Sequence, residues 1–143
     1  MRKLIVFGCL FSSLAFADRK VVQPKEFPTG RPFSPAVWAG DTLYVAGQIG
    51  SDLKTGKVPE KFEDEVKQCL ENIGIILKEA GLSYDDVVTV NVYLTSTSFF
   101  PQLNSVYTTY FKDPRPARTT VGVGGLAGGA RIEITVTAYK GKK

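Results

Sequence analysis

The chain has 143 residues, of which 43% are hydrophobic, and a formal net charge of +4. This length and composition indicate one globular domain with an ordinary apolar core. The sequence contains no histidine, which excludes a Ser-His-Asp triad, a Cys-His pair and the usual zinc sites. It also contains neither a P-loop nor a dinucleotide-binding fingerprint. Any chemistry must therefore use carboxylates, arginine, hydroxyls, backbone groups and water.

The first 17 residues have the pattern of a secretory signal peptide. A charged start at Arg2-Lys3 precedes a mostly apolar run over 4–14, and Ala15-Phe16-Ala17 has the small-x-small form of a cleavage site. The apolar run is too short and too rich in serine for a membrane span. We predict that 1–17 is a signal peptide and that 18–143 is a single domain, secreted or periplasmic and not bound to the membrane. A buried N-terminal strand is the alternative.

Removing the signal would leave a mildly basic protein with one cysteine. Loss of Arg2 and Lys3 lowers the formal net charge from +4 to +2, and Cys9 leaves with them. An intramolecular disulfide is then impossible, and Cys69 is predicted to be a core residue. Lysines and arginines are scattered among acids, apart from the tail at 140–143. We therefore expect no nucleic acid partner.

The N-terminal third is predicted to contain three strands. A short strand at 19–23 is followed by a proline-punctuated loop over 27–35. Strands at 36–39 and 42–46 flank a Gly40-Asp41 turn. The residues Gly47-Gln48-Ile49-Gly50 follow the second of these strands.

The middle of the chain predicts two helices around one strand. Apolar residues recur with a 3.6-residue period over 61–80, and Gly81 is placed to end that helix. The segment 87–95 alternates valine and leucine with polar residues, as a half-buried strand does. A second helix is predicted over 98–111. The proline-containing segment 113–116, which follows it, prevents the helix from continuing.

The C-terminal segments 117–123 and 131–136 both alternate as strands do. The glycine-rich connection 124–129 suits a reversal, so these segments predict a hairpin. Its polar face would bring Arg118 and Glu133 into the same neighbourhood. A plain alternative is an exposed cross-strand ion pair, which contributes at most about 1 kcal/mol.

This order of elements predicts an α+β fold, with two helices on one face of a mixed sheet. The other sheet face would then be an unusually large exposed patch. Burial of that face between copies of the chain, in a closed symmetric assembly, is the expected solution.

The motif Pro116-Ala117-Arg118-Thr119-Thr120-Val121-Gly122-Val123, followed by Ile132-Glu133-Ile134, resembles the C-terminal signature of the Rid (YjgF-type) reactive-intermediate deaminases. The resemblance implies a chorismate-mutase-like fold, a homotrimer with sites in clefts between subunits, and no metal or organic cofactor. In that family the motif arginine holds a substrate carboxylate, and the glutamate helps to place the hydrolytic water. The matching catalytic residues are Arg118 and Glu133.

The resemblance also marks substrate-binding positions. These are Asn104, for which an exposed helix asparagine is the alternative, and Gly47, Phe33 and Thr120. The chain departs from the family pattern at Phe33, where a tyrosine is usual, and at Ala46, where a serine is usual. At Thr120 deaminating relatives often have cysteine.

The predicted function is hydrolysis of 2-imino acids or enamines to 2-oxo acids and ammonia. The main alternative is a trimer of the same fold that binds small carboxylic acids without catalysis, because two polar contacts are missing. An endoribonuclease is a third class, against which the weak positive charge and the missing histidine argue.

Overall fold

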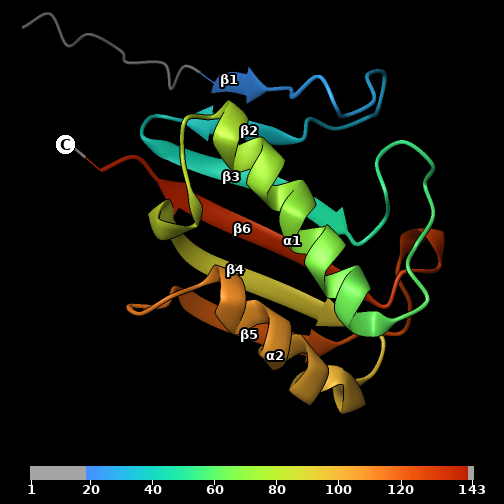
Figure 1. The fold of residues 1–143 in the computed structure, drawn as a ribbon. Coiled ribbons are helices and arrows are strands. Elements are labelled where there is room, and N and C mark those ends of the chain that lie inside the picture. The colour runs from blue at the N-terminus through green and yellow to red at the C-terminus, as the bar shows by residue number, and fades with distance from the viewer. Residues whose placement is uncertain (1–18, 142–143) are drawn as a thin grey trace, which may run out of the picture.

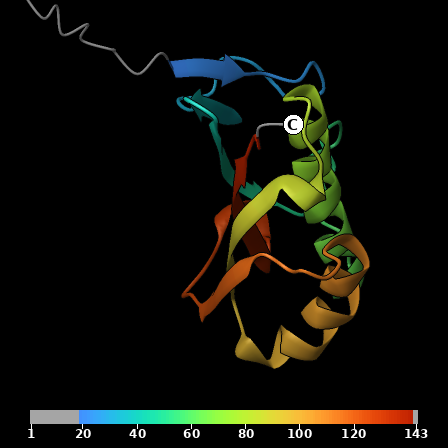
Figure 2. The ribbon, with the colours of Figure 1, turned by 90° about the vertical axis from the view of Figure 1, so that its left-hand side faces the viewer.

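The structure, a computed structural model, describes residues 19–141 as a six-stranded sheet with two helices on one face (Figures 1 and 2). The strand order is β1-β2-β3-β6-β4-β5; neighbours are antiparallel, except for the parallel pair β4 and β5. This confirms the predicted fold class. The elements are β1 Arg19–Val22, β2 Ala36–Ala39, β3 Thr42–Ile49, α1 Phe62–Glu79, β4 Val87–Leu94, α2 Phe100–Tyr110, β5 Ala117–Gly122 and β6 Ile132–Tyr139, with 3-10 turns at Tyr84–Asp86, Thr97–Phe99 and Ala127–Gly129.

The core lies between the helices and the facing side chains of the central strands. Val90 and Val92 of β4 and Ile132 and Ile134 of β6 are completely buried, and they alternate with residues of the opposite face. Each such side chain contributes roughly 1.5–3 kcal/mol when it leaves water. The apolar stripe of α1 covers them, and Cys69 within that stripe is buried as predicted.

The predicted hairpin between 117–123 and 131–136 is wrong, because β4 lies between β5 and β6. β4 pairs with β5 in parallel and with β6 in antiparallel orientation. The chain leaves β4, forms α2 and returns to the same edge, and such a crossover gives a parallel neighbour. The glycine-rich segment therefore carries the chain past one strand instead of closing a two-strand turn.

A buried ion pair joins the first turns of α1 to the start of β6. The Glu65 carboxylate is fully buried and accepts hydrogen bonds at 2.6 Å from both the backbone N–H and the Nε of Arg131. Arg131 also donates through Nη2 to the Pro59 carbonyl at 2.7 Å. A Cβ at Gly50 would overlap the Glu65 backbone, so a glycine is needed where β3 ends against this helix.

The second face of the sheet carries no helix within residues 19–141 (Figure 2). Its side chains include the exposed Tyr44 of β3 and Val121 of β5. On the same face the Asn91 side-chain amide donates a hydrogen bond to the Thr135 hydroxyl at 3.3 Å. No helix in the described residues is long and apolar enough to cross a membrane. The predicted signal peptide lies outside the described residues.

Candidate functional site

Arg118 extends from the edge strand β5 towards α2. Its Nη1 donates a hydrogen bond to Asn104 Oδ1 at 2.9 Å, and its guanidinium carbon lies 4.6 Å from the centre of the Tyr107 ring. Asn104 and Tyr107 are one helical turn apart on α2, so both reach the same neighbour. The structure thus brings together Arg118 and Asn104, two of the predicted site residues.

Thr120 follows on the same face of β5, because alternate residues of a strand share a face. In the sheet register it lies opposite the buried Val92, as Arg118 lies opposite the buried Val90. The Thr120 hydroxyl is buried and has no hydrogen-bond partner within the described part of the chain. The Tyr107 hydroxyl is likewise buried and has no hydrogen-bond partner within the described residues. Buried polar atoms of this kind are uncommon in folded proteins and ask for an explanation.

Burial raises the pKa of the Tyr107 phenol, although the positive charges of Arg118 and Arg115 act in the opposite direction. The phenol hydroxyl therefore stays protonated, and the side chain uncharged, at neutral pH. A neutral aromatic face can still attract the arginine cation through its quadrupole. Tyr107 is not among the site residues marked by the sequence, and its place one turn after Asn104 was the available signal for a role beside Arg118.

Glu133 lies on the other face of the sheet. It stands between Ile132 and Ile134, which are both completely buried on the helix side. In the register it lies beside Ile49 of β3 and Tyr93 of β4. The structure therefore does not bring Glu133 to Arg118 within one chain, and the expectation of a shared neighbourhood is wrong. The reason is again β4, which both separates the two strands and sets their registers.

Gly47 of β3 lies against the Glu133 side chain. The pairing of β3 with β6 is irregular between Val45 and Gln48, and Gly47 lies in this irregular stretch. A Cβ at Gly47 would overlap Glu133 Oε1. Only glycine allows the carboxylate to approach the β3 backbone this closely, so Gly47 and Glu133 form one unit.

Phe33 joins neither group by a described contact. It lies in the loop before β2 and is 51% exposed, with the Arg31 guanidinium 5.7 Å from its ring centre. Ala46, the other departure from the family pattern, is half-buried, and its backbone N–H donates to the Pro35 carbonyl at 2.9 Å.

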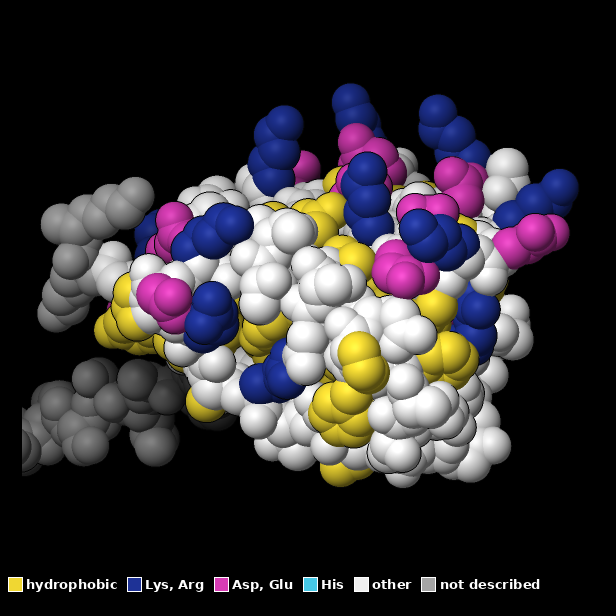
Figure 3. All heavy atoms as spheres, turned by 60° about the horizontal axis from the view of Figure 1, so that its bottom comes forward, with side chains coloured by type: hydrophobic (Ala, Val, Ile, Leu, Met, Phe, Trp, Pro, Cys, Tyr) yellow, Lys and Arg dark blue, Asp and Glu magenta, His cyan; other side chains and the backbone are white. Residues whose placement is uncertain are grey.

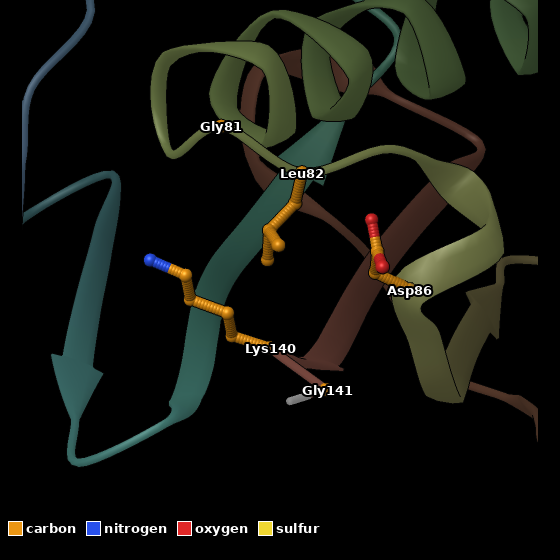
Figure 4. A pocket seen from close by; sticks show the side chains of 5 residues that line it. All are labelled: Gly81, Leu82, Asp86, Lys140 and Gly141. Atoms are coloured by element: carbon orange, nitrogen blue, oxygen red, sulfur yellow. The ribbon is translucent and has the colours of Figure 1, made fainter. Parts of the chain in front are cut away.

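One hollow of about 170 Å³ lies away from the predicted residues, beside the C-terminal ends of α1 and β6 (Figure 4). Its lining includes Asp86, whose carboxylate accepts hydrogen bonds from the Ser83 N–H at 2.8 Å and the Ser83 hydroxyl at 3.1 Å. The Lys140 amine points away from Asp86 (Figure 4). No group of three or more His, Cys, Asp or Glu residues that could hold a metal occurs within 19–141.

The sequence profile of the family described as Endoribonuclease L-PSP matches residues 24–140. The chain is 42% identical over 125 residues to a RutC family protein of Aquifex aeolicus, which covers 85% of this chain and 99% of that protein. It is 39% identical over 125 residues to the 2-iminobutanoate/2-iminopropanoate deaminase of the mouse, covering 86% of this chain and 93% of that enzyme.

Solved structures agree with these relatives. RidA from the Antarctic bacterium Psychrobacter superposes with a TM-score of 0.80 at 38% identity, covering 85% of this chain and 99% of RidA. Yeast Mmf1 superposes with a TM-score of 0.81 at 31% identity, covering 87% and 100%. The fold and the profile match thus define the class, and the chain belongs to the RutC/YjgF/Rid family.

Proposed function

We propose that this protein is an imine deaminase that hydrolyses 2-imino acids, or the enamines from which they form, to 2-oxo acids and ammonia. The observation that carries the proposal is the Arg118 guanidinium, which is held against α2 without a carboxylate partner among residues 19–141. The relationship to mouse and rat enzymes named 2-iminobutanoate/2-iminopropanoate deaminase supports the choice of substrate class.

Arg118 is suited to the carboxylate end of such a substrate. A guanidinium offers five N–H donors in a planar fork and stays charged at every working pH. Only Nη1 is engaged in a described hydrogen bond, with Asn104. The remaining donors can bind both oxygens of a carboxylate, a charge-assisted geometry that fixes position as well as affinity. Thr120 lies two residues further along the same face of β5, and the proposal assigns its buried hydroxyl no contact with the ligand.

Glu133 would act as the general base for the hydrolytic water. A water molecule adds to the electrophilic imine carbon and gives up a proton, which the Glu133 carboxylate accepts. Addition to the protonated imine in this way gives a carbinolamine. Glu133 returns the proton to its nitrogen, and the carbon–nitrogen bond breaks as the hydroxyl gives its own proton to the Glu133 carboxylate, so that ammonia leaves and the carbonyl forms. Positioning and one general base are sufficient for this reaction, because the imine carbon is already reactive. The proposal includes no cofactor.

A complete site requires two chains in this proposal. Arg118 and Glu133 lie on opposite faces of the sheet, so we propose a homotrimer in which Arg118 of one copy faces Glu133 and Gly47 of the next. The uncovered sheet face with its exposed Tyr44 and Val121 supports assembly. Light scattering should give about three times the chain mass, and a stable monomer at micromolar concentration would contradict the trimer.

Export is a further part of the proposal, based on the sequence pattern of 1–17. Mass spectrometry of the protein from its natural source should find an N-terminus at Asp18. An intact Met1 on cytoplasmic protein would contradict export and leave the proposed chemistry unaffected.

The alternative function is carboxylate binding without catalysis. It is favoured by Phe33 and Ala46, which carry no hydroxyl where the family usually has one. The deciding experiment is steady-state ammonia release from freshly generated 2-iminobutanoate. Wild type and the control Glu79→Gln, an exposed carboxylate at the end of α1, should release ammonia, whereas Glu133→Gln should not. Absence of turnover in wild type, with retained binding of 2-oxobutanoate, would favour the binder. Purified protein incubated with RNA tests the endoribonuclease in the same series.

A further inference from the structure

The Tyr107 ring lies directly against the Arg118 guanidinium, at 4.6 Å from ring centre to guanidinium carbon. We infer that Tyr107 is a positioning residue, whose aromatic face holds the Arg118 fork ready for a carboxylate. The inference rests on the proposed function, because it assumes that Arg118 binds a carboxylate. It assigns to α2 a second task besides packing on the sheet.

The ring is firmly anchored. Tyr107 is 3% exposed, and its ring lies 4.5 Å from that of the buried Phe111. Phe111 in turn packs edge-on against Tyr84 at 5.5 Å. Aromatic contacts of this kind restrict the rings beyond simple burial. The surface under Arg118 is therefore part of the core.

Two contacts hold the arginine from different directions. The ring lies under the guanidinium carbon, whereas the Asn104 amide oxygen accepts a hydrogen bond from Nη1 at 2.9 Å. A long arginine side chain otherwise loses much of its rotamer freedom when a ligand fixes it. Fixing it before the ligand arrives removes part of that cost from binding. Arg118 itself is exposed, so without these contacts nothing described in the chain would restrain its end.

The ring, and not the hydroxyl, makes the contact. The Tyr107 hydroxyl is buried and has no hydrogen-bond partner among residues 19–141. A phenylalanine at this position would keep the aromatic face and remove an unpaired polar atom. Leucine or methionine would keep an apolar side chain and remove the face. These substitutions separate the positioning role from simple core filling.

The test compares Tyr107→Phe, Tyr107→Leu and Tyr107→Met with Tyr110→Leu. Tyr110 is an aromatic residue on the same helix that contacts Tyr84 instead of Arg118. Calorimetric titration measures the affinity for 2-oxobutanoate and for its uncharged amide. Tyr107→Leu and Tyr107→Met should bind the carboxylate about five- to tenfold more weakly, with the amide changed less than about twofold. Tyr107→Phe and Tyr110→Leu should stay within about twofold of wild type for both.

A second measurement needs no ligand. Protons of the Arg118 side chain should show an upfield ring-current shift in NMR spectra of wild type and Tyr107→Phe, with the signals assigned through Arg118→Lys. If the leucine and methionine variants fail to fold, these two proteins still decide the contact. An Arg118 signal like those of the other arginines would overturn the inference.

The two proposals fail in different ways. If Tyr107→Leu and Tyr110→Leu bind 2-oxobutanoate equally well, the positioning role is wrong. The deaminase proposal is unaffected by that result as long as the wild type releases ammonia and Arg118→Ala weakens binding. No binding of 2-oxobutanoate and no ammonia release by wild type removes the proposed function, and the positioning role falls with it.

Discussion

The two helices pack on the same face of the sheet but differ in how they treat polar groups. In α1 the buried Glu65 carboxylate is fully paired with Arg131. In α2, which contains no charged residue, the Tyr107 hydroxyl and the Gln102 side-chain oxygen are buried without a hydrogen-bond partner in the described chain. On the surface shown in Figure 3, charged side chains of both signs gather along the upper part and few lie in the lower part.

This difference separates stability from function. A buried, fully satisfied charge fixes one arrangement of two elements. An exposed arginine that uses one described donor on Asn104 instead leaves donors for a ligand. α1 therefore holds the fold together at the start of β6, whereas α2 supports Arg118. The following predictions test this division, from the largest expected effect to the smallest.

The strongest effect on stability is expected at Glu65. Glu65→Ala leaves the partly buried Arg131 without its carboxylate and should lower the free energy of unfolding by about 3–5 kcal/mol. Urea denaturation at fixed protein concentration measures it. Glu71→Ala is the control, because Glu71 faces Lys67 at 3.8 Å on the exposed side of the same helix; its loss should cost less than about 0.5 kcal/mol. Similar effects of the two substitutions would mean that the buried pair is not what secures α1.

Arg118→Ala should do the reverse. Unfolding should change by less than about 1 kcal/mol, since the side chain is exposed, while the affinity for 2-oxobutanoate falls at least about tenfold with the lost charge-assisted hydrogen bonds. Arg118→Lys should recover only part, because an ammonium cannot bind both oxygens in the same plane. Titration of both variants beside Arg19→Ala, an exposed arginine of β1, measures the effect. Loss of folding without a selective loss of ligand would make Arg118 structural.

Gly47→Ala tests the Glu133 half of the site. The added methyl group must displace the Glu133 carboxylate, so turnover of 2-iminobutanoate should fall roughly tenfold or more through misplacement of the base. Binding of 2-oxobutanoate through Arg118 should stay within about threefold. Gly124→Ala is the matched control, since a Cβ there meets no atom within 4 Å. Unchanged turnover in Gly47→Ala would show that the position of Glu133 does not matter for the reaction.

The smallest effect is on the pH dependence of stability. Burial raises the pKa of the Cys69 thiol far above its usual range, with the Glu65 charge adding to it. The unfolded thiol ionises near its ordinary pKa of about 8.5. The stabilising contribution is therefore complete below that value and is lost as pH rises. By pH 9.5 the free energy of unfolding should fall by about 1 kcal/mol through this group.

Cys69→Ala provides the comparison for that titration. Its unfolding free energy should decline less between pH 8 and 9.5, although the half-buried Tyr84 phenol, whose pKa is also raised by burial, begins to contribute above that range. Parallel curves for the two proteins would contradict the assignment to Cys69.

Local pattern was sufficient to predict most elements of the fold. The helix predicted over 61–80 is observed at Phe62–Glu79 and the strand predicted over 87–95 at Val87–Leu94, because periodic burial depends on neighbouring residues alone. The pairing of β5 with β6 was predicted wrongly. Pairing depends on which strand enters the sheet between two others, and the glycine-rich connection carries no information about β4.

The same distinction applies to the site. Resemblance to the family marked Arg118, Asn104 and Glu133 as candidate site residues, but it did not indicate that Arg118 and Glu133 lie on opposite faces of the sheet. The contact of Tyr107 with Arg118 and the pairing of Glu65 with Arg131 join residues of different elements. Neither follows from sequence spacing, because both depend on how the helices sit on the sheet.

Complementation between two inactive variants tests the central claim most directly. Arg118→Ala and Glu133→Gln are unfolded together, refolded as a one-to-one mixture and assayed for ammonia release from 2-iminobutanoate. If each site combines Arg118 of one copy with Glu133 of the next, about a quarter of the sites regain both residues by random assembly. We predict about that fraction of wild-type activity from the mixture, with neither variant active alone. Activity of the mixture no higher than that of the separate variants, beside an active refolded wild type, would contradict a site shared between chains.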